Sequence, residues 1–197
     1  MTSTHARLRD EGGGEPPVME GADGERLPAE IVLRRAACTG DLERMRAALA
    51  QGADVNWSDM RRAPTSTDES SPVTGDTALH IAAQYGHMDA AVLLCQAGAD
   101  VEARSRIGST ALHRAASEGH ANVVAFLAEQ MGASVHAVNK IGNTALHAAV
   151  CARQPAAAAE LIRAMRGDGI HARNNIGMRA VDYADGCRDL QTLFDGP

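Results

Sequence analysis

Aromatic residues are scarce in this sequence. They make up 3% of its 197 residues, with one Trp, two Tyr and two Phe. A large globular core normally uses such bulky side chains, so their scarcity favours thin helical layers. It also counts against a protein that stacks the bases of single-stranded nucleic acid.

Several other features are also absent. No apolar run approaches the length of a membrane-spanning helix, and residues 1–17 lack the apolar middle of a signal peptide. The net charge of −6 argues against a general nucleic-acid binder, although a local basic stripe is compatible with it. The four cysteines lie far apart and form no C-x-x-C pair, which indicates reduced thiols, three of them in helices. We expect a protein of the cell interior. The cytoplasm is the expected compartment, and the nucleus is the alternative.

What the chain does contain is an internal repeat. The tetrapeptide TALH begins at Thr77, Thr110 and Thr144, so the sequence repeats with a period of 33 and then 34 residues. A period of this length indicates stacked supersecondary units.

Each unit has the pattern of two short antiparallel helices and a hairpin-like loop. In the central unit Thr110 is placed to cap the first helix through its hydroxyl, and Gly119 to end it in the left-handed conformation. A second helix ends at Gly132, and a β-tolerant loop closes on Gly142. The apolar stripes of the two helices are Leu112, Ala115 and Ala116, and Val123, Val124 and Leu127. One such pair cannot bury its own apolar face, so the units must stack.

The pattern G-x-TALH-x-AA-x-x-GH, followed by an apolar helix and GADV, resembles the ankyrin repeat. The match is close in residues 75–104 and 108–138, partial in 142–173, and degenerate before and after these. The resemblance implies an all-α ankyrin-repeat solenoid of about five units, two of them caps. We expect such a capped solenoid to be a monomer by itself.

The predicted organisation has a disordered tail and one repeat domain. The tail covers residues 1–27 and the repeat domain 28–196. In the N-terminal cap repeat, Arg34 and Arg35 are expected on the outward side, as solenoid caps require. The C-terminal cap is expected to keep its first helix and to shorten its second. The parts of the domain are the cap repeat 28–56, an inserted loop 57–74, repeats 75–107, 108–141 and 142–176, and the partial repeat 177–196.

The inserted loop allows two interpretations. It is rich in Ser, Thr, Pro and acidic residues, so it is either a tolerated surface insertion or a regulatory segment. A phosphorylation site such as Ser71, which precedes a proline, would make it regulatory. Trp57, at its start, either packs onto the hairpins or is an exposed anchor for a ligand.

Histidine is the first candidate for chemistry, because His80, His113 and His147 occur once per repeat. Equivalent residues of stacked units lie about 8–10 Å apart, whereas the ligands of one zinc lie about 2.0–2.1 Å from it. The resemblance implies instead that these side chains hydrogen-bond the backbone of neighbouring hairpins, and His87 and His120 are also assigned structural roles. No nucleophile elbow, phosphate-binding loop or zinc signature is present. We therefore expect no enzyme, no cofactor and no metal.

The remaining candidate is a surface for binding another protein. The resemblance implies that partners bind on a concave face made of hairpin tips and the exposed side of the first helices. Carried over to this sequence, the tip residues are Arg104, Arg106, Ile107, Ser109, Val138, Lys140, Ile141, Asn143, Arg173, Asn175, Ile176 and Met178. The helix residues are Gln84, Tyr85, Ser117, Glu118, Cys151 and Ala152, with Arg114 beside Tyr85 and Trp57 as the possible anchor.

The tips carry positive charge although the whole protein is acidic. Arg104, Arg106, Lys140 and Arg173 lie on successive tips, which favours a partner with an acidic surface or peptide, unless the charges only keep the loops soluble. The leading hypothesis is a non-catalytic adaptor or scaffold that binds another protein. The alternatives are an inhibitory or assembly-chaperone subunit of an enzyme or proteolytic complex and, less favoured, a nucleic-acid binder.

Overall fold

The structure, a computed structural model, describes residues 27–59 and 74–195. The expected tail lies outside the described residues except for Leu27. Ser71 and residues 60–73 of the insertion lie outside them as well. Among the described residues, no helix is both long and apolar enough to cross a membrane.

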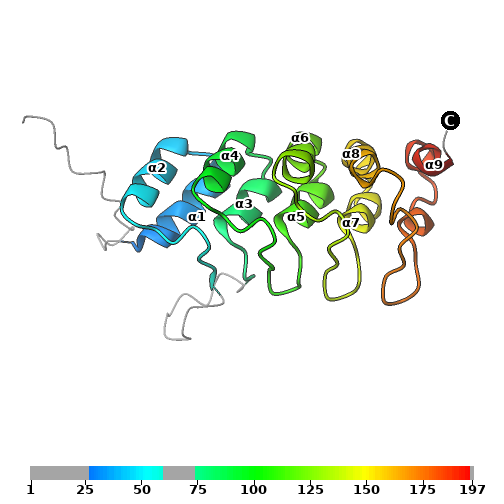
Figure 1. The fold of residues 1–197 in the computed structure, drawn as a ribbon, viewed down its shortest axis with the longest axis horizontal. Coiled ribbons are helices and arrows are strands. Elements are labelled where there is room, and N and C mark those ends of the chain that lie inside the picture. Colours follow the sequence, from blue (N-terminus) through cyan, green and yellow to red (C-terminus); the bar gives the residue numbers. More distant parts are fainter. Residues whose placement is uncertain (1–26, 60–73, 196–197) are drawn as a thin grey trace, which may run out of the picture.

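The described chain is a row of helix pairs joined by hairpins, and all the hairpins point the same way (Figure 1). The first helices of the pairs form one layer and the second helices another. The first helices are α1 (Ala29–Thr39), α3 (Ala78–Gln84), α5 (Ala111–Glu118) and α7 (Ala145–Cys151), followed by the 3₁₀ helix η3 (Ala180–Tyr183). The second helices are α2 (Leu42–Ala50), α4 (Met88–Gln96), α6 (Ala121–Ala125) continued by η2 (Phe126–Gln130), α8 (Pro155–Met165) and α9 (Arg188–Asp195). The predicted all-α ankyrin-repeat solenoid is confirmed.

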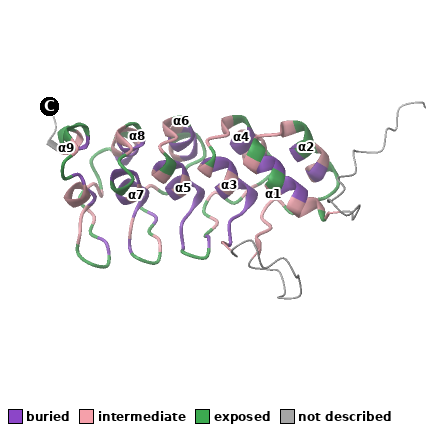
Figure 2. Ribbon diagram, turned by 180° about the vertical axis from the view of Figure 1, so that it is seen from behind, coloured by how far each residue is buried: buried purple, intermediate pink, exposed green. Residues whose placement is uncertain are grey.

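Small side chains allow the first helices to pack closely against one another. Leu33, Leu79, Leu112 and Leu146 hold the same position in successive units, and each is only 1% exposed. The same helices contain fully buried alanines such as Ala83, whose small side chains let neighbouring first helices approach closely. Buried residues line the helix interfaces, and exposed residues gather at the hairpin tips (Figure 2).

The 34-residue period of the central unit comes from one extra residue in its second helix. The segment from Gly119 to Gly132 is one residue longer than that from Gly86 to Gly98. The structure accommodates this residue as a turn of π-helix, in which the amide of Met131 donates to the carbonyl of Phe126 at 3.1 Å. A π-bulge is the usual way for a helix to take up a single inserted residue.

The expectation for the C-terminal unit was wrong about its first helix, which is not kept at full length. Its second helix, α9, is eight residues long, whereas its first is the four-residue 3₁₀ helix η3. The cause lies in the spacing, because Gly186 follows Arg179 by seven positions, whereas Gly86 follows Thr77 by nine. The missing residues leave room for only a tight turn.

The expectation for Arg34 was also wrong. Its side chain does not lie on the outward side of the N-terminal unit but reaches toward the next one. One guanidinium nitrogen lies 3.5 Å from the carboxylate of Asp59, and the guanidinium carbon lies 5.4 Å from the centre of the Trp57 ring. Trp57 is half-buried beneath this arginine, in a cation–π arrangement.

Candidate partner-binding surface

A histidine in the first turn helps to cap the first helix of each internal unit. The backbone amides of Thr77, Thr110 and Thr144 donate to the Nδ1 atom of the histidine three residues later, at 3.2 to 3.3 Å. Histidine thus takes the place that glutamate or glutamine has in a capping box. The hydroxyl of Thr144 accepts from the amide of His147 at 3.4 Å, as expected of a cap, and Thr110 forms a capping box with His113. The hydroxyls of Thr110 and Thr144 also lie 2.9 and 2.8 Å from the Nδ1 atom of the histidine three residues later.

The other ring nitrogen of each histidine fixes the following hairpin. Because Nδ1 accepts a hydrogen bond, Nε2 carries the proton and donates it to a backbone carbonyl. The Nε2 atoms of His80, His113 and His147 lie 2.9, 3.0 and 3.1 Å from the carbonyl oxygens of the next hairpin, at Ser109, Asn143 and Met178. Burial lowers the pKa of all three histidines, so the neutral ring that these bonds require is favoured. The predicted structural role is confirmed.

A histidine also attaches the start of a second helix to the end of the first helix of the preceding unit. The Nε2 atoms of His87 and His120 lie 3.0 and 2.9 Å from the carbonyl oxygens of Cys38 and Gln84 in the preceding unit, which confirms their structural role. Each ring lies directly against a left-handed glycine of that unit, where a Cβ atom would collide with it. In the fourth unit Gln154 takes the place of histidine and lies against Gly119.

The hairpin tips form a regular row. In three of them a four-residue turn closes with an amide–carbonyl bond of 2.8 to 2.9 Å, for example from Gly108 to Ser105. Each tip is also bonded to the tip before it, since the amide of Lys140 donates to the carbonyl of Ile107 at 3.0 Å, and that of Asn175 to Ile141 at 3.1 Å. The tips therefore have a fixed spacing and orientation.

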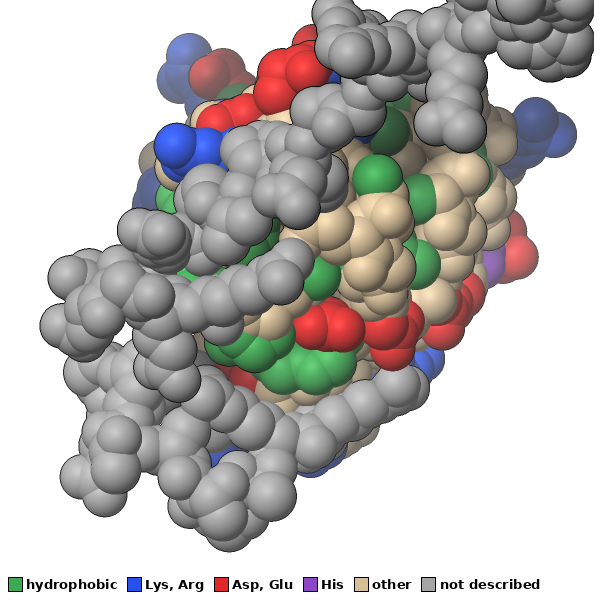
Figure 3. Space-filling model, turned by 90° about the vertical axis from the view of Figure 1, so that its left-hand side faces the viewer, with side chains coloured by type: hydrophobic (Ala, Val, Ile, Leu, Met, Phe, Trp, Pro, Cys, Tyr) green, Lys and Arg blue, Asp and Glu red, His purple; other side chains and the backbone are tan. Residues whose placement is uncertain are grey.

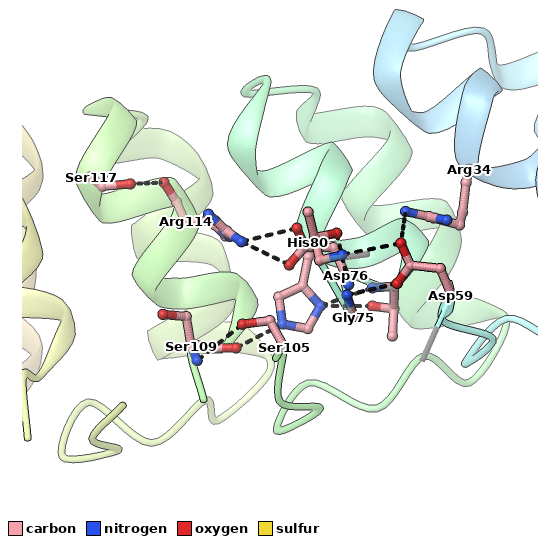
Figure 4. Close-up of polar contacts among 11 residues, drawn as sticks. Arg34, Asp59, Gly75, Asp76, His80, Ser105, Ser109, Arg114 and Ser117 are labelled. Carbon is pink, nitrogen blue, oxygen red and sulfur yellow. Dashed lines mark hydrogen bonds and ion pairs between the residues drawn. The ribbon is translucent and has the colours of Figure 1, made fainter. Parts of the chain in front are cut away.

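The insertion emerges from the tip of the first hairpin, where Asp59 ties its two ends together. One carboxylate oxygen of Asp59 accepts from the amide of Gly75 at 2.6 Å and the other from that of Thr74 at 3.2 Å (Figure 4). Asp59 holds the position that Ser105 has in the next hairpin. The backbone amide of Arg106 donates to the carbonyl of Thr74 at 2.8 Å, as the amide of Lys140 does to the carbonyl of Ile107. The arms of this hairpin are therefore those of an ordinary unit, and the insertion replaces only the turn.

A buried ion pair joins the second and third units. One guanidinium nitrogen of Arg114 lies 3.0 and 2.9 Å from the two carboxylate oxygens of Asp76 (Figure 4). The side chain of Asp76 is 6% exposed and that of Arg114 is 23% exposed. The Nε atom of Arg114 is buried without a hydrogen-bond partner, so the pairing is incomplete. Arg114 therefore has a structural partner on the surface where we expected it to meet a ligand.

The sequence-predicted surface residues differ widely in exposure. Trp57, Gln84, Arg114, Ser117, Asn143 and Met178 are half-buried, and Ser109 is buried, so its side chain is removed from the accessible surface. The hydroxyl of Ser117 donates to the carbonyl of Arg114. The exposed residues are Tyr85, Arg104, Arg106, Ile107, Glu118, Val138, Lys140, Ile141, Arg173, Asn175 and Ile176, together with Cys151 and Ala152.

Two of the tip cations also support the hairpins. The guanidinium of Arg104 donates to the carbonyl of Val138 on the next hairpin at 2.6 Å, and to that of Gly108 on its own at 3.3 Å. Arg173 donates to the carbonyl of Gly177 at 2.6 Å. These bonds keep the positive charge in place on the tips without neutralising it, because carbonyls carry no formal charge.

A hollow lies in the layer of second helices, between α4 and η2. It has a volume of about 290 Å³ and is lined by Met88, Val92, Cys95, Gln96, Phe126, Gln130 and Met131. Burial raises the pKa of the Cys95 thiol, which disfavours the reactive thiolate. All four cysteines are free thiols, and only Cys151 is exposed.

No metal-binding group of three or more His, Cys, Asp or Glu occurs within the described ranges. Seen from the N-terminal end of the stack, acidic side chains line up along one edge, while the visible Lys and Arg side chains are scattered (Figure 3). This view therefore shows no continuous basic stripe of the kind that follows a nucleic-acid backbone.

Comparison with known proteins agrees with this geometry. The family model for ankyrin repeats, which spans three copies of the repeat, matches residues 33–139 and 102–175. The chain belongs to the ankyrin-repeat family, whose members bind other proteins. No curated protein matches the sequence.

Two residues that organise this surface were missed from the sequence. Asp59 lies inside a stretch that was treated wholly as insertion, although its spacing from Gly52 equals that of Ser105 from Gly98. Asp76 directly precedes TALH, where the other units have Ser109 and Asn143. A comparison of equivalent positions would have marked both as acidic substitutions in the repeat.

Proposed function

We propose that this protein is a non-catalytic adaptor or scaffold that binds another protein on its hairpin surface. This surface consists of the hairpin tips and the exposed side of α3, α5 and α7. The observation that carries the proposal is that four of the six exposed large apolar side chains in the described residues lie on the tips, beside fixed positive charges. Exposed apolar side chains of this kind mark binding sites when they gather on one face.

The tips also favour one kind of partner. Segments 103–109, 137–143 and 172–178 contain Arg104, Arg106, Lys140 and Arg173 and no acidic residue, in a protein of net charge −6. An acidic partner surface would be attracted to them and repelled by most of the remaining molecule. The four free thiols suit the cytoplasm, where we place the protein.

The proposal can be tested by capture from cell lysate. The wild type is compared with a variant carrying Arg106→Glu and Lys140→Glu, which leaves the carbonyl-bound Arg104 and Arg173 intact. A matched control carries Arg46→Glu and Arg166→Glu, two exposed cations of the second-helix layer. We expect a protein that binds the wild type and the control but not the tip variant. Equal capture by all three would place binding elsewhere.

A further inference from the structure

The hairpin tips combine positive charge with exposed apolar side chains. No Asp or Glu occurs in any of the three tip segments, which are residues 103–109, 137–143 and 172–178. Among the described residues, no carboxylate forms an ion pair with Arg104, Lys140 or Arg173. On the same tips, Ile141 and Ile176 are 61% and 77% exposed. A segment that fits this surface therefore carries carboxylates with apolar residues beside them.

One segment of the same chain has this composition. Residues 10–25 read DEGGGEPPVMEGADGE, with six acidic residues and no Lys, Arg or His. Val18 and Met19 stand between Glu15 and Glu20, so the apolar side chains are flanked by carboxylates. The segment lies outside the described residues, and its charge and length come from the sequence alone. Its charge is complementary to that of the tips.

The segment joins the fold on the side of the hairpins. Each internal first helix follows its hairpin directly, and α1 begins on the same side of the stack, with Pro28 as its N-cap (Figure 1). Stacked helices lie about 8–10 Å apart, so the three tips lie on the order of 20–40 Å along the stack from α1. Leu27 follows Asp10 by 17 positions, and a chain of that length spans up to about 56 Å when extended. The segment is therefore long enough to reach every tip.

Attachment to the same chain compensates for the weakness of exposed ion pairs. Such pairs are individually weak and are weakened further by salt. A covalently attached segment, however, is present at an effective concentration of about 1 mM, whereas a partner must bind from its much lower free concentration. Several weak contacts are thus enough for the segment to compete with a partner for the same surface.

We propose that residues 10–25 bind the hairpin tips of their own chain and compete there with the acidic partner protein. The carboxylates of the segment face Arg104, Lys140 and Arg173, and its apolar residues cover the exposed isoleucines. A partner then binds only by displacing the segment, which selects against weakly binding acidic surfaces. This inference rests on the proposed function and adds to it a regulation of the same surface by the chain itself.

A labelled peptide with the sequence of residues 10–25 tests the inference. Its binding is measured by fluorescence anisotropy at low salt, to the full-length wild type and to a tail-neutral variant in which the six carboxylates are replaced by amides. The substitutions are Asp10→Asn, Glu11→Gln, Glu15→Gln, Glu20→Gln, Asp23→Asn and Glu25→Gln. We expect the tail-neutral variant to bind the peptide at least threefold more tightly than the wild type, because the wild-type tail occupies the same site.

Two further variants, both made in the tail-neutral chain, locate the site. Arg106→Gln/Lys140→Gln removes two tip cations. The matched control, Arg46→Gln/Arg166→Gln, removes two exposed cations of the second-helix layer. Peptide binding should be at least threefold weaker for the tip variant and unchanged for the control, with the fold of both checked by circular dichroism.

Three results would overturn the inference. Equal binding of the peptide by the wild type and the tail-neutral variant would show that the tail does not occupy the site. Equal binding by the tip variant and the control would place the peptide elsewhere, and no binding to the tail-neutral variant would show that the tail has no affinity for the tips. None of these results decides the proposed function, because lysate capture by the wild type and its own tip variant tests it separately.

Discussion

Arg114 donates two hydrogen bonds to Asp76 across the boundary between the second and third repeats, at 3.0 and 2.9 Å. Neither residue has a counterpart with the same chemistry in the next unit, where the equivalent positions are Ser109 and Ala148. The ion pair is therefore a local feature of one interface added to a regular stack.

Removal of one partner of this pair should destabilise the protein. Arg114→Ala leaves the buried carboxylate of Asp76 without a counter-ion, and we expect a loss of about 2–3 kcal/mol, below the range for fully buried pairs because Arg114 is partly exposed. The double variant Asp76→Ser/Arg114→Ala carries the residues of the next unit and should recover most of the loss. Urea unfolding followed by circular dichroism measures both. A double variant no more stable than the single one would contradict this explanation.

The stability of the fold should fall in mild acid. Burial lowers the pKa of His80, His113 and His147 from the unfolded value of 6.5, so below that value the unfolded chain binds more protons than the folded one. The contribution of these histidines is therefore complete above about pH 6.5 and is lost as the pH falls toward the folded pKa values. Nearby charges act in both directions, with Asp76 raising the pKa of His80, and Arg114 lowering it. Glu102 and Asp182 likewise raise the pKa of His113 and His147, whereas Arg104 and His80 lower that of His113.

This pH dependence can be measured from urea midpoints between pH 7.5 and 5.5. The wild-type midpoint should decrease over this range, and His113→Asn should give a shallower decrease whatever its stability at pH 7.5. A wild-type midpoint that stays constant down to pH 5.5 would show that protonation does not disturb the histidine bonds.

Alanine substitutions at two left-handed glycines can measure the cost of backbone strain apart from the cost of a collision with the next unit. Gly52 has a φ of 85° and nothing close to its missing Cβ, whereas Gly119 has a φ of 82° and lies against the side chain of Gln154. Gly52→Ala should therefore cost about 1–2 kcal/mol from strain alone, and Gly119→Ala should cost more. Adding Gln154→Ala to Gly119→Ala should reduce the additional loss. Equal unfolding free energies for Gly52→Ala and Gly119→Ala would contradict the role of Gln154.

The insertion should be dispensable for folding. Replacement of residues 60–73 by one arginine gives a turn of the same length as Ser105–Gly108, and it should raise the unfolding free energy by about 1–2 kcal/mol because a shorter loop is closed. Asp59→Ala in the full chain should instead cost about 1–3 kcal/mol, since the amides of Thr74 and Gly75 lose their charged acceptor. Loss of cooperative unfolding in the shortened chain would show that the insertion supports the stack.

The sequence predicted the features that repeat and missed those that occur once. The period and the glycine at the end of α5 follow from patterns present in several units, so neighbouring repeats support each prediction. The histidine bonds to the next hairpin follow from the resemblance to the ankyrin repeat, which several units share. The inward position of Arg34 and its contacts with Asp59 and Trp57 depend on one particular pair of neighbouring units. A single sequence does not show that these residues meet.

The spacing of the glycines revealed an extra residue in the central unit but did not show where in the structure that residue lies. One extra residue in the central unit was visible from Gly98 and Gly132, but its place in a π-helical turn depends on which backbone bonds can be given up at least cost. The candidate surface was likewise predicted only in part. The tip residues were found by register, whereas the burial of Ser109 and the carbonyl contacts of Arg104 and Arg173 became apparent only from the folded hairpins.

The most direct test of the binding surface is hydrogen exchange of the protein with and without the partner captured on its wild-type form. The account predicts that the partner slows exchange at residues 104–108, 138–142 and 173–177, with little change in α2, α4 and α8. Slower exchange confined to α4 and η2, around Cys95, with no change at the hairpin tips, would contradict the account and place the partner on the opposite layer.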